Sequence, residues 1–217
     1  MMAYRGILFD LDGTLLDTLQ DLADSANQAL RQSGLPTHPQ DAYRYFVGDG
    51  VHNLILRALG EHQEHFDRVM ADYRAIYARD REKNTRPYPG ILKMLEELRA
   101  LDVKVCVFSN KPDSDTQAVI RHYFPDYPFA VIRGSLPGVG VKPDPAGANA
   151  VVEQLGISKA ELLYAGDTST DMDCARNAGI ASIGVTWGFR PREELEAHQA
   201  RWVVDDPAQI TQLFQST

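Results

Sequence analysis

Short apolar segments alternate with longer segments of helical periodicity along most of the chain. Six apolar segments are nearly continuous, as are strands that are covered on both faces of a sheet. They span residues 6–9, 104–108, 129–132, 162–165, 181–185 and 202–204. Two helical segments between them end at Gly156 and Gly179, and glycine favours a helix C-terminus. The alternation predicts an α/β fold, with a Rossmann-like parallel sheet core and helices on both faces.

One interval, residues 18–86, interrupts this alternation because it shows helical periodicity and no strand pattern. Its apolar residues recur at helical spacing in three stretches, residues 19–30, 51–58 and 66–77. We therefore predict that residues 17–86 form an inserted all-α helical domain, and that residues 1–16 and 87–217 form the core. The aromatic residues of the insert are interpreted as its own hydrophobic core rather than as ligand contacts.

Composition and charge narrow the range of partners. The 217 residues carry 22 Lys and Arg against 30 Asp and Glu, a net charge of −8. This balance argues against nucleic acid, whose phosphates demand a basic face, but a metal ion could still adapt an acidic site to a small phosphorylated metabolite. No apolar segment approaches the ~18 residues of a membrane span. The segment before Asp10 is too short for a signal peptide, and Cys106 and Cys174 fit reduced thiols, so a cytoplasmic protein is expected.

Two aspartates follow the first predicted strand in the motif Asp10-Leu-Asp12-Gly-Thr. Residues two apart in an extended chain face the same side, so both carboxylates are directed at the carboxyl end of the strand, where open α/β sheets bind ligands. Adjacent anions repel each other unless a cation or a shared proton relieves them. The pair therefore suggests a metal-bound nucleophile beside a general acid, although a simple turn at Asp12 would also fit the motif.

Further polar residues stand at later strand ends or at the start of a helix. Each alone would also fit a helix cap, a turn or a surface charge. Because the carboxyl ends of parallel strands meet at one edge, their shared order favours a single magnesium and phosphate site. These residues are Ser109, Asn110, Lys111, Lys142, Asp167 and Asp171.

Together these motifs resemble those of the haloacid dehalogenase-like hydrolases, over nearly the whole chain. The matching residues are Asp10-x-Asp12-Gly13-Thr14, Ser109, Lys142 and Gly166-Asp167-x-x-x-Asp171. The helical insert resembles the C1-type cap of that family. Within the family, residues 47–51, 109–112, 173–179 and 185–189 resemble segments of bacterial phosphoglycolate phosphatases.

The resemblance implies a Mg²⁺-dependent phosphatase for a small phosphomonoester, with 2-phosphoglycolate the best single candidate and an aspartyl-phosphate intermediate. It implies that Asp10 is the nucleophile and that Asp12 is the general acid and base. It also implies that Mg²⁺ is held by Asp10, the Asp12 backbone carbonyl and Asp167. Asp171 would support the metal through waters or through hydrogen bonds to its ligands.

Other residues would bind the substrate. By resemblance, the phosphate contacts are Ser109, Asn110 through its backbone, Lys142 and Thr14. The candidates for selecting the leaving group are Gly48, Asp49, Gly50 and Lys111. The two glycines would let backbone amides approach a ligand, and Lys111 could pair with a second anionic group.

Several other functions could use the same residues. A phosphomutase acting on sugar phosphates would retain the phosphoryl group for transfer, and a pyrophosphatase or nucleotidase would differ only in the leaving group. A dehalogenase is less favoured, because attack on a carbon–halogen bond gives Asp12 no clear role. A non-enzymatic phospho-receiver domain carries its phosphoacceptor on a later strand and has no such insert. Either a monomer or a homodimer is compatible with the sequence.

Overall fold

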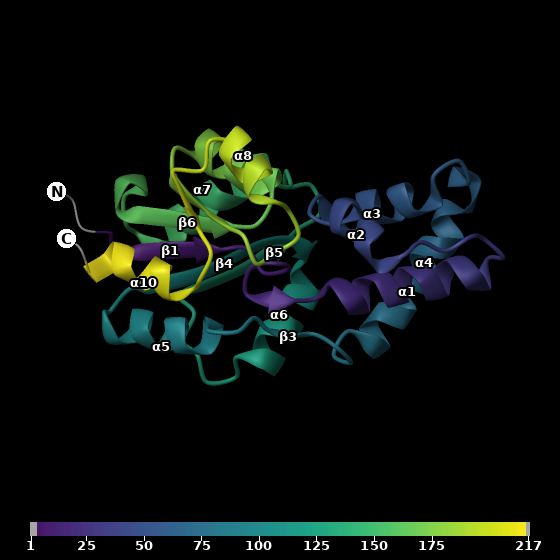
Figure 1. Cartoon of the computed structure of the whole chain (residues 1–217), viewed down its shortest axis with the longest axis horizontal. Coiled ribbons are helices and arrows are strands. Elements are labelled where there is room, and N and C mark those ends of the chain that lie inside the picture. The colour runs from purple at the N-terminus through teal and green to yellow at the C-terminus, as the bar shows by residue number, and fades with distance from the viewer. Residues whose placement is uncertain (1–3, 216–217) are drawn as a thin grey trace.

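Six parallel strands form one sheet in the larger part of the molecule (Figure 1). The computed structural model describes residues 4–215. Residues 1–3 and 216–217, which belong to the predicted core and in part to the segment before Asp10, lie outside the described residues. The strand order is β5-β4-β1-β6-β7-β8. The strands are β1 (Gly6–Phe9), β4 (Lys104–Pro112), β5 (Val131–Ser135), β6 (Leu162–Gly166), β7 (Ala181–Val185) and β8 (Trp202–Val204). The predicted parallel sheet is confirmed.

Helices cover both faces of this sheet, as predicted. One face carries α5 (Ile91–Ala100), α6 (Asp113–Tyr123) and α10 (Ala208–Gln215), and the other carries α7 (Ala146–Leu155) and α8 (Ser169–Ala178). A short helix, α9 (Arg192–Ala197), packs beside β7, and a 3-10 turn (Lys159–Glu161) leads into β6. Successive strand residues point to opposite faces. Ile7 and Phe9 therefore join the hydrophobic cluster of α5, whereas Leu8 joins that of α7.

Two strands differ from their predicted bounds. β4 continues beyond residue 108 to Pro112, and its pairing with β5 is irregular over that extension. β5 begins at Val131 rather than at residue 129. Phe129 instead packs its ring against Tyr127 and Phe124, so aromatic packing rather than sheet pairing accounts for its apolar character. The extension of β4 carries polar residues of the candidate site.

A helical unit lies beside the sheet, on the right in Figure 1. It contains α1 (Leu19–Gln32), α2 (Gln40–Phe46), α3 (Gly50–Leu59), a 3-10 turn (Gln63–His65) and α4 (Phe66–Asp80). These helices bury their own hydrophobic cluster, which Phe189 of the core completes. The periodicity did not predict α2, because Tyr43 is its one buried residue and it has no apolar stripe. We call this unit the insert; its status as a separate domain spanning residues 17–86 stays a prediction.

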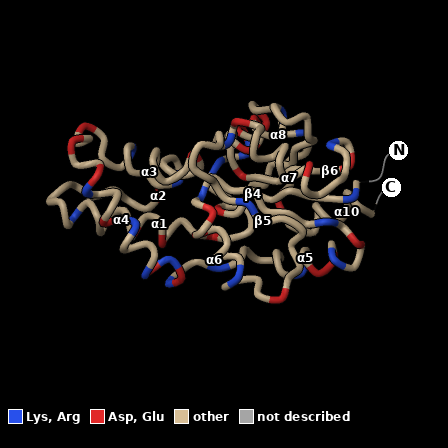
Figure 2. The backbone as a smooth tube through the Cα atoms, turned by 180° about the vertical axis from the view of Figure 1, so that it is seen from behind, with Lys and Arg blue, Asp and Glu red and all other residues tan. Residues whose placement is uncertain are grey.

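Two short strands connect the insert to the sheet. β2 (Leu16–Asp17) pairs antiparallel with β3 (Arg86–Pro87), and both predicted domain boundaries fall within this ribbon. Figure 2 shows Lys and Arg positions scattered among Asp and Glu positions over both the sheet and the insert. Both cysteines are buried free thiols. None of the helices within residues 4–215 has the length and apolarity to cross a membrane.

Candidate active site

The carboxyl ends of β1, β4 and β6 lie side by side and bring distant polar residues together. Phe9 is opposite Val107 of β4 and Ala165 of β6, so the residues that follow emerge at one edge of the sheet. Asp10 follows β1, Ser109 lies near the end of β4, and Asp167 follows β6. The parallel register therefore produces the convergence that the sequence predicted.

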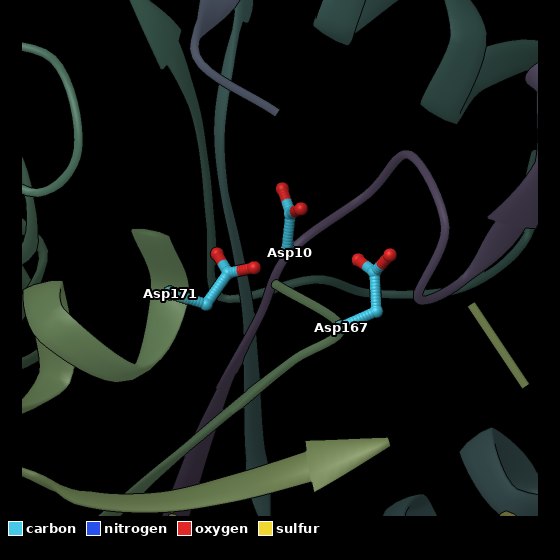
Figure 3. Close-up of side chains that lie close together, drawn as sticks. All are labelled: Asp10, Asp167 and Asp171. Atoms are coloured by element: carbon cyan, nitrogen blue, oxygen red, sulfur yellow. The ribbon is translucent and has the colours of Figure 1, made fainter. Parts of the chain in front are cut away.

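Three carboxylates meet at this edge (Figure 3). Each of Asp10, Asp167 and Asp171 offers an oxygen within 4.8 Å of the others, and all three residues are buried. The ammonium of Lys142, also buried, lies 2.8 Å from an oxygen of Asp10 and 2.8 Å from an oxygen of Asp171. One cation thus faces three buried carboxylates, which leaves the cluster with excess negative charge.

Burial and this excess negative charge raise the pKa values of two of the carboxyl groups. Burial raises the pKa of Asp10 from 3.8 to about 7; the Lys142 ammonium opposes the rise, and repulsion from Asp171 and Asp12 adds to it. Burial, followed by repulsion from Asp171 and Asp10, also raises the pKa of Asp167 well above its ordinary value. A divalent cation would relieve this repulsion, and grouped carboxylate oxygens are the donors that hard cations prefer. The residues present therefore fit a metal site.

Asp167 is held in place through both oxygens. The hydroxyl of Thr14 donates to Oδ1 at 3.0 Å, and the backbone N–H of Phe189 donates to Oδ2 at 2.8 Å. A Cβ on Gly13 or on Gly188 would collide with the Asp167 side chain, so glycine is required at both positions. Thr14 thus directs its hydroxyl at a carboxylate. A phosphate contact, as predicted, would require that hydrogen bond to break.

Asp171 stands at the start of α8 and is engaged through both oxygens. Its Oδ2 accepts hydrogen bonds from the backbone N–H and the hydroxyl of Thr168, which caps the helix. Its Oδ1 accepts from Lys142 and, at 3.3 Å, from the Tyr164 hydroxyl. With its lone pairs used in this way, Asp171 is suited to holding Lys142 beside Asp10.

The side chain of Asn110 joins three segments of the site. Its Oδ1 accepts from the backbone N–H of Lys142 at 2.8 Å, and its Nδ2 donates to the carbonyls of Lys142 at 3.1 Å and Gly48 at 3.0 Å. Asn110 therefore positions Lys142 and anchors the loop before α3. The predicted phosphate contact uses its backbone, which this arrangement leaves unaffected.

Asp12 is paired with a lysine in a way that the sequence did not predict. The Lys111 ammonium lies 3.0 Å from one Asp12 oxygen and 2.8 Å from the other. Lys111 itself is buried. Its backbone N–H donates to the Ser109 hydroxyl oxygen at 3.2 Å, so Ser109 is held beside it.

A cavity of about 350 Å³ separates this edge of the sheet from the insert. Its core wall includes Asp10, Asp12, Ser109, Asn110 and Lys111. Its insert wall is mainly apolar and is formed by Leu22, Val47, Gly48, Gly50, Val51, Leu54, Tyr73, Arg74 and Tyr77, while Pro112, Ser114 and Asp115 complete the lining. A cavity of this size falls in the range of small-molecule sites.

Of the four residues predicted to select the substrate, three line the cavity and one does not. Gly48, Gly50 and Lys111 line the cavity, but Asp49 does not. The Asp49 carboxylate accepts a hydrogen bond from the Thr170 hydroxyl at 2.7 Å and pairs with Arg57. Burial raises the pKa of Asp49, but the hydrogen bonds from Thr170 and Arg57 outweigh it and the net pKa is lowered. Asp49 therefore connects the insert to the core and faces away from the ligand space.

Sequence reasoning did not place the aromatic residues of α4 at the cavity. Tyr73 and Tyr77 of α4 belong to the hydrophobic cluster of the insert, as their periodicity indicated, but they also line the cavity. Their spacing of four residues places both rings on one helix face, and the rings stack 5.6 Å apart. Periodicity assigns both rings to a buried face, but it does not reveal that this face borders a cavity.

Hydrogen bonds close the cavity by joining the insert to the core. They connect Asn110 to Gly48, Thr170 to Asp49, Arg190 to Val47, and Arg44 to Gly188. Each of these pairs joins one residue of the insert with one residue of the core. The insert therefore covers the charged edge of the sheet.

Comparisons with known proteins agree with this geometry. The family model described as "haloacid dehalogenase-like hydrolase" matches residues 7–185. A phosphoglycolate phosphatase of Vibrio vulnificus is 36% identical, over 94% of this chain and 93% of that protein. A phosphoglycolate phosphatase of Vibrio parahaemolyticus is 31% identical, over 95% and 94%. The crystal structure of a predicted phosphoglycolate phosphatase from Haemophilus somnus superposes with a TM-score of 0.90 at 29% identity, covering 98% of this chain and 99% of that one.

Proposed function

The chain belongs to the haloacid dehalogenase-like hydrolase family and is a phosphoric monoester hydrolase, and we propose that its substrate is 2-phosphoglycolate, which it cleaves to glycolate and phosphate. The names of relatives that match more than nine-tenths of the chain support this substrate. The observation that carries the proposal is the buried group of Asp10, Asp167, Asp171 and Lys142, of which Asp10 lines the covered cavity.

We propose Mg²⁺ as the metal. The carboxylates of Asp10 and Asp167 and the backbone carbonyl of Asp12 would hold it, with Asp171 supporting the site through Lys142. When bound, the ion supplies positive charge that offsets the repulsion between an attacking carboxylate and a phosphoryl group. The excess negative charge of the buried cluster supports this assignment.

Asp10 acts as the nucleophile in the proposed reaction. A carboxylate oxygen of Asp10 attacks phosphorus, the bond to the ester oxygen breaks, and an aspartyl-phosphate forms on Asp10. Asp12 donates a proton to the departing ester oxygen. It then takes a proton from the water that attacks the aspartyl-phosphate, which releases phosphate and restores the Asp10 carboxylate. Lys142 keeps Asp10 oriented and offsets its charge.

The other proposed phosphate contacts come from Ser109 and from the backbone of Asn110, which both line the cavity. Thr14 contributes indirectly, through Asp167. The insert acts as a cap in this proposal: it covers an intermediate that bulk water would hydrolyse and places Gly48 and Gly50 against the leaving group. A cytoplasmic location and a monomeric or homodimeric state stay predictions.

A substrate panel tests this function. Phosphate release is measured for 2-phosphoglycolate, pyrophosphate, nucleotides and sugar phosphates, with Mg²⁺ and with a chelator. We expect 2-phosphoglycolate to give the highest kcat/KM, and the chelator to abolish turnover. Conversion of a hexose 1-phosphate to its 6-phosphate with little free phosphate would instead indicate a phosphomutase.

A further inference from the structure

We propose that Lys111 and the hydroxyl of Tyr77 form a subsite for a carboxylate on the leaving group, and that a carboxylate bound there takes Lys111 away from Asp12. The inference rests on the proposed phosphatase function and adds to it the chemistry by which the leaving group is recognised. It makes Tyr77 a specificity-determining residue and makes the Lys111–Asp12 pair exchangeable.

The Lys111–Asp12 pair occupies both oxygens of the proposed general acid. The two N–O distances are 3.0 and 2.8 Å, so the ammonium lies across the whole carboxylate. In this arrangement a leaving group would have to share the Asp12 carboxylate with the ammonium. The Lys111 side chain is 5% exposed and that of Asp12 is 18% exposed, so water can replace little of this interaction. An anion that competes for Lys111 would release Asp12.

Tyr77 supplies the second donor. Its ring lies under the Lys111 ammonium, 4.9 Å from nitrogen to ring centroid, and its buried hydroxyl donates to no acceptor within residues 4–215. Burial raises the pKa of Tyr77 to about 12, although Lys111 opposes the rise, so the hydroxyl keeps its proton. Buried hydroxyls are normally hydrogen-bonded. Because Tyr77 also lines the cavity and stands beside the Lys111 ammonium, a ligand carboxylate that reaches Lys111 would supply the missing acceptor.

The position of this subsite defines the class of leaving group. Lys111 follows Ser109 and Asn110 and contacts Asp12, so an anion on Lys111 would stand close to the ester oxygen that Asp12 must reach. A carboxylate near the ester carbon meets that requirement, as in 2-phosphoglycolate. Among the described residues that line the cavity, the other cation is Arg74, whose side chain is exposed.

Exchange of the ion pair couples recognition to turnover. A substrate that carries a carboxylate gains two donors and also frees Asp12, so it should be favoured in both KM and kcat. A substrate of the same length with a neutral leaving group leaves Lys111 on Asp12. It should therefore lose kcat as well as affinity.

The test compares 2-phosphoglycolate with 2-hydroxyethyl phosphate, in which a hydroxymethyl group replaces the carboxylate. The wild type, Tyr77→Phe and Lys111→Met are assayed for kcat and KM with both substrates. We expect the preference for 2-phosphoglycolate, as a ratio of kcat/KM values, to fall about tenfold in Tyr77→Phe and about 100-fold in Lys111→Met. Tyr123→Phe is the control, because it removes another buried tyrosine hydroxyl, on α6 and outside the cavity lining.

Binding provides a readout that is independent of turnover. In an Asp10→Asn background, calorimetry should show that Tyr77→Phe weakens binding of 2-phosphoglycolate about tenfold more than binding of 2-hydroxyethyl phosphate. If Tyr77→Phe and Lys111→Met change both ligands by the same factor, or if Arg74→Gln alone removes the preference, the subsite is wrong while the phosphatase function stands. Selective binding of 2-phosphoglycolate by the wild type without any release of phosphate would instead contradict the proposed function and support the subsite.

Discussion

The two walls of the cavity are built on different principles. The core wall is charged and buried, and its carboxylates are fixed by short contacts, such as the 2.8 Å approach of Lys142 to Asp10. The insert wall is mainly apolar, and its polar groups contact the core chiefly through hydrogen bonds such as that from Asn110 to Gly48. The comparison indicates that the reaction is determined by the core and that the choice of leaving group is determined where the two walls meet.

Removing the nucleophile should have the largest effect and should fall on the core wall alone. Asp10→Asn keeps the shape of the side chain but weakens it as a nucleophile, so we expect kcat to fall by roughly 10⁴- to 10⁶-fold. Phosphate release measures the loss, and circular dichroism should show an unchanged fold. Full activity in this variant would assign the nucleophile elsewhere.

Removing the buried cation should destabilise the protein as well as inactivate it. Lys142→Met leaves Asp10 and Asp171 without their shared counter-charge, which should lower the free energy of unfolding by about 3–5 kcal/mol. Urea denaturation measures the change. Lys104→Met is the matched control: Lys104 is half exposed and pairs with exposed Asp102, so the expected loss is about 0–1 kcal/mol. Equal losses in the two variants would contradict the electrostatic account of the core wall.

Releasing Asp167 from one of its donors should have a smaller effect. Thr14→Val removes the hydroxyl that donates to Asp167, and an unsatisfied buried acceptor costs about 1–3 kcal/mol. We expect kcat/KM to fall about tenfold and the concentration of Mg²⁺ required for half-maximal activity to rise. Thr211→Val removes a comparable hydrogen bond, to Glu97, far from the site. Thr211→Val should lower the stability without changing the Mg²⁺ requirement. An equal rise of the Mg²⁺ requirement in both variants would show that Thr14 has no specific role at the site.

The pH dependence of stability should give the smallest effect, because other carboxylates in the protein oppose it. The pKa of Asp10 is raised from 3.8 to about 7, so between these values the folded protein binds the proton more tightly than the unfolded chain. In chelator, this contribution is complete below about pH 4 and is lost as the pH rises to about 7. Thermal unfolding at several pH values, with chelator and with Mg²⁺, measures it. Mg²⁺ should stabilise the protein more at pH 7 than at pH 5. Equal stabilisation at both pH values would contradict the claim that the buried cluster carries excess negative charge.

The core wall could be predicted from the sequence to a large extent. Apolar strands alternate with helices, parallel strands end at one edge, and polar residues follow those ends, so the convergence of Asp10, Ser109 and Asp167 is a consequence of topology. What the pattern did not predict was the choice of partners. It indicated neither that Lys111 pairs with Asp12 nor that Thr14 bonds to Asp167.

The insert wall was less accessible to sequence reasoning. Its helices were predicted where an apolar stripe exists, and α2 was missed because it has none. Asp49 stands in a loop that borders the cavity, yet its side chain turns to Thr170. Tyr77 reads as a core residue because its ring is buried, and only the structure reveals that it also lines the cavity. Burial follows from periodicity, but the direction of a polar atom depends on tertiary contacts.

The central claim is that the carboxylate of Asp10 receives the phosphoryl group. The most direct test is an acid quench during turnover of 2-phosphoglycolate with Mg²⁺, followed by borohydride reduction and mass spectrometry of the peptide that contains residue 10. We expect borohydride to reduce the aspartyl-phosphate with loss of phosphate, so that residue 10 is found as homoserine in the wild type. Homoserine at another aspartate, or an unmodified Asp10 at every quench time while phosphate is released, would contradict the account.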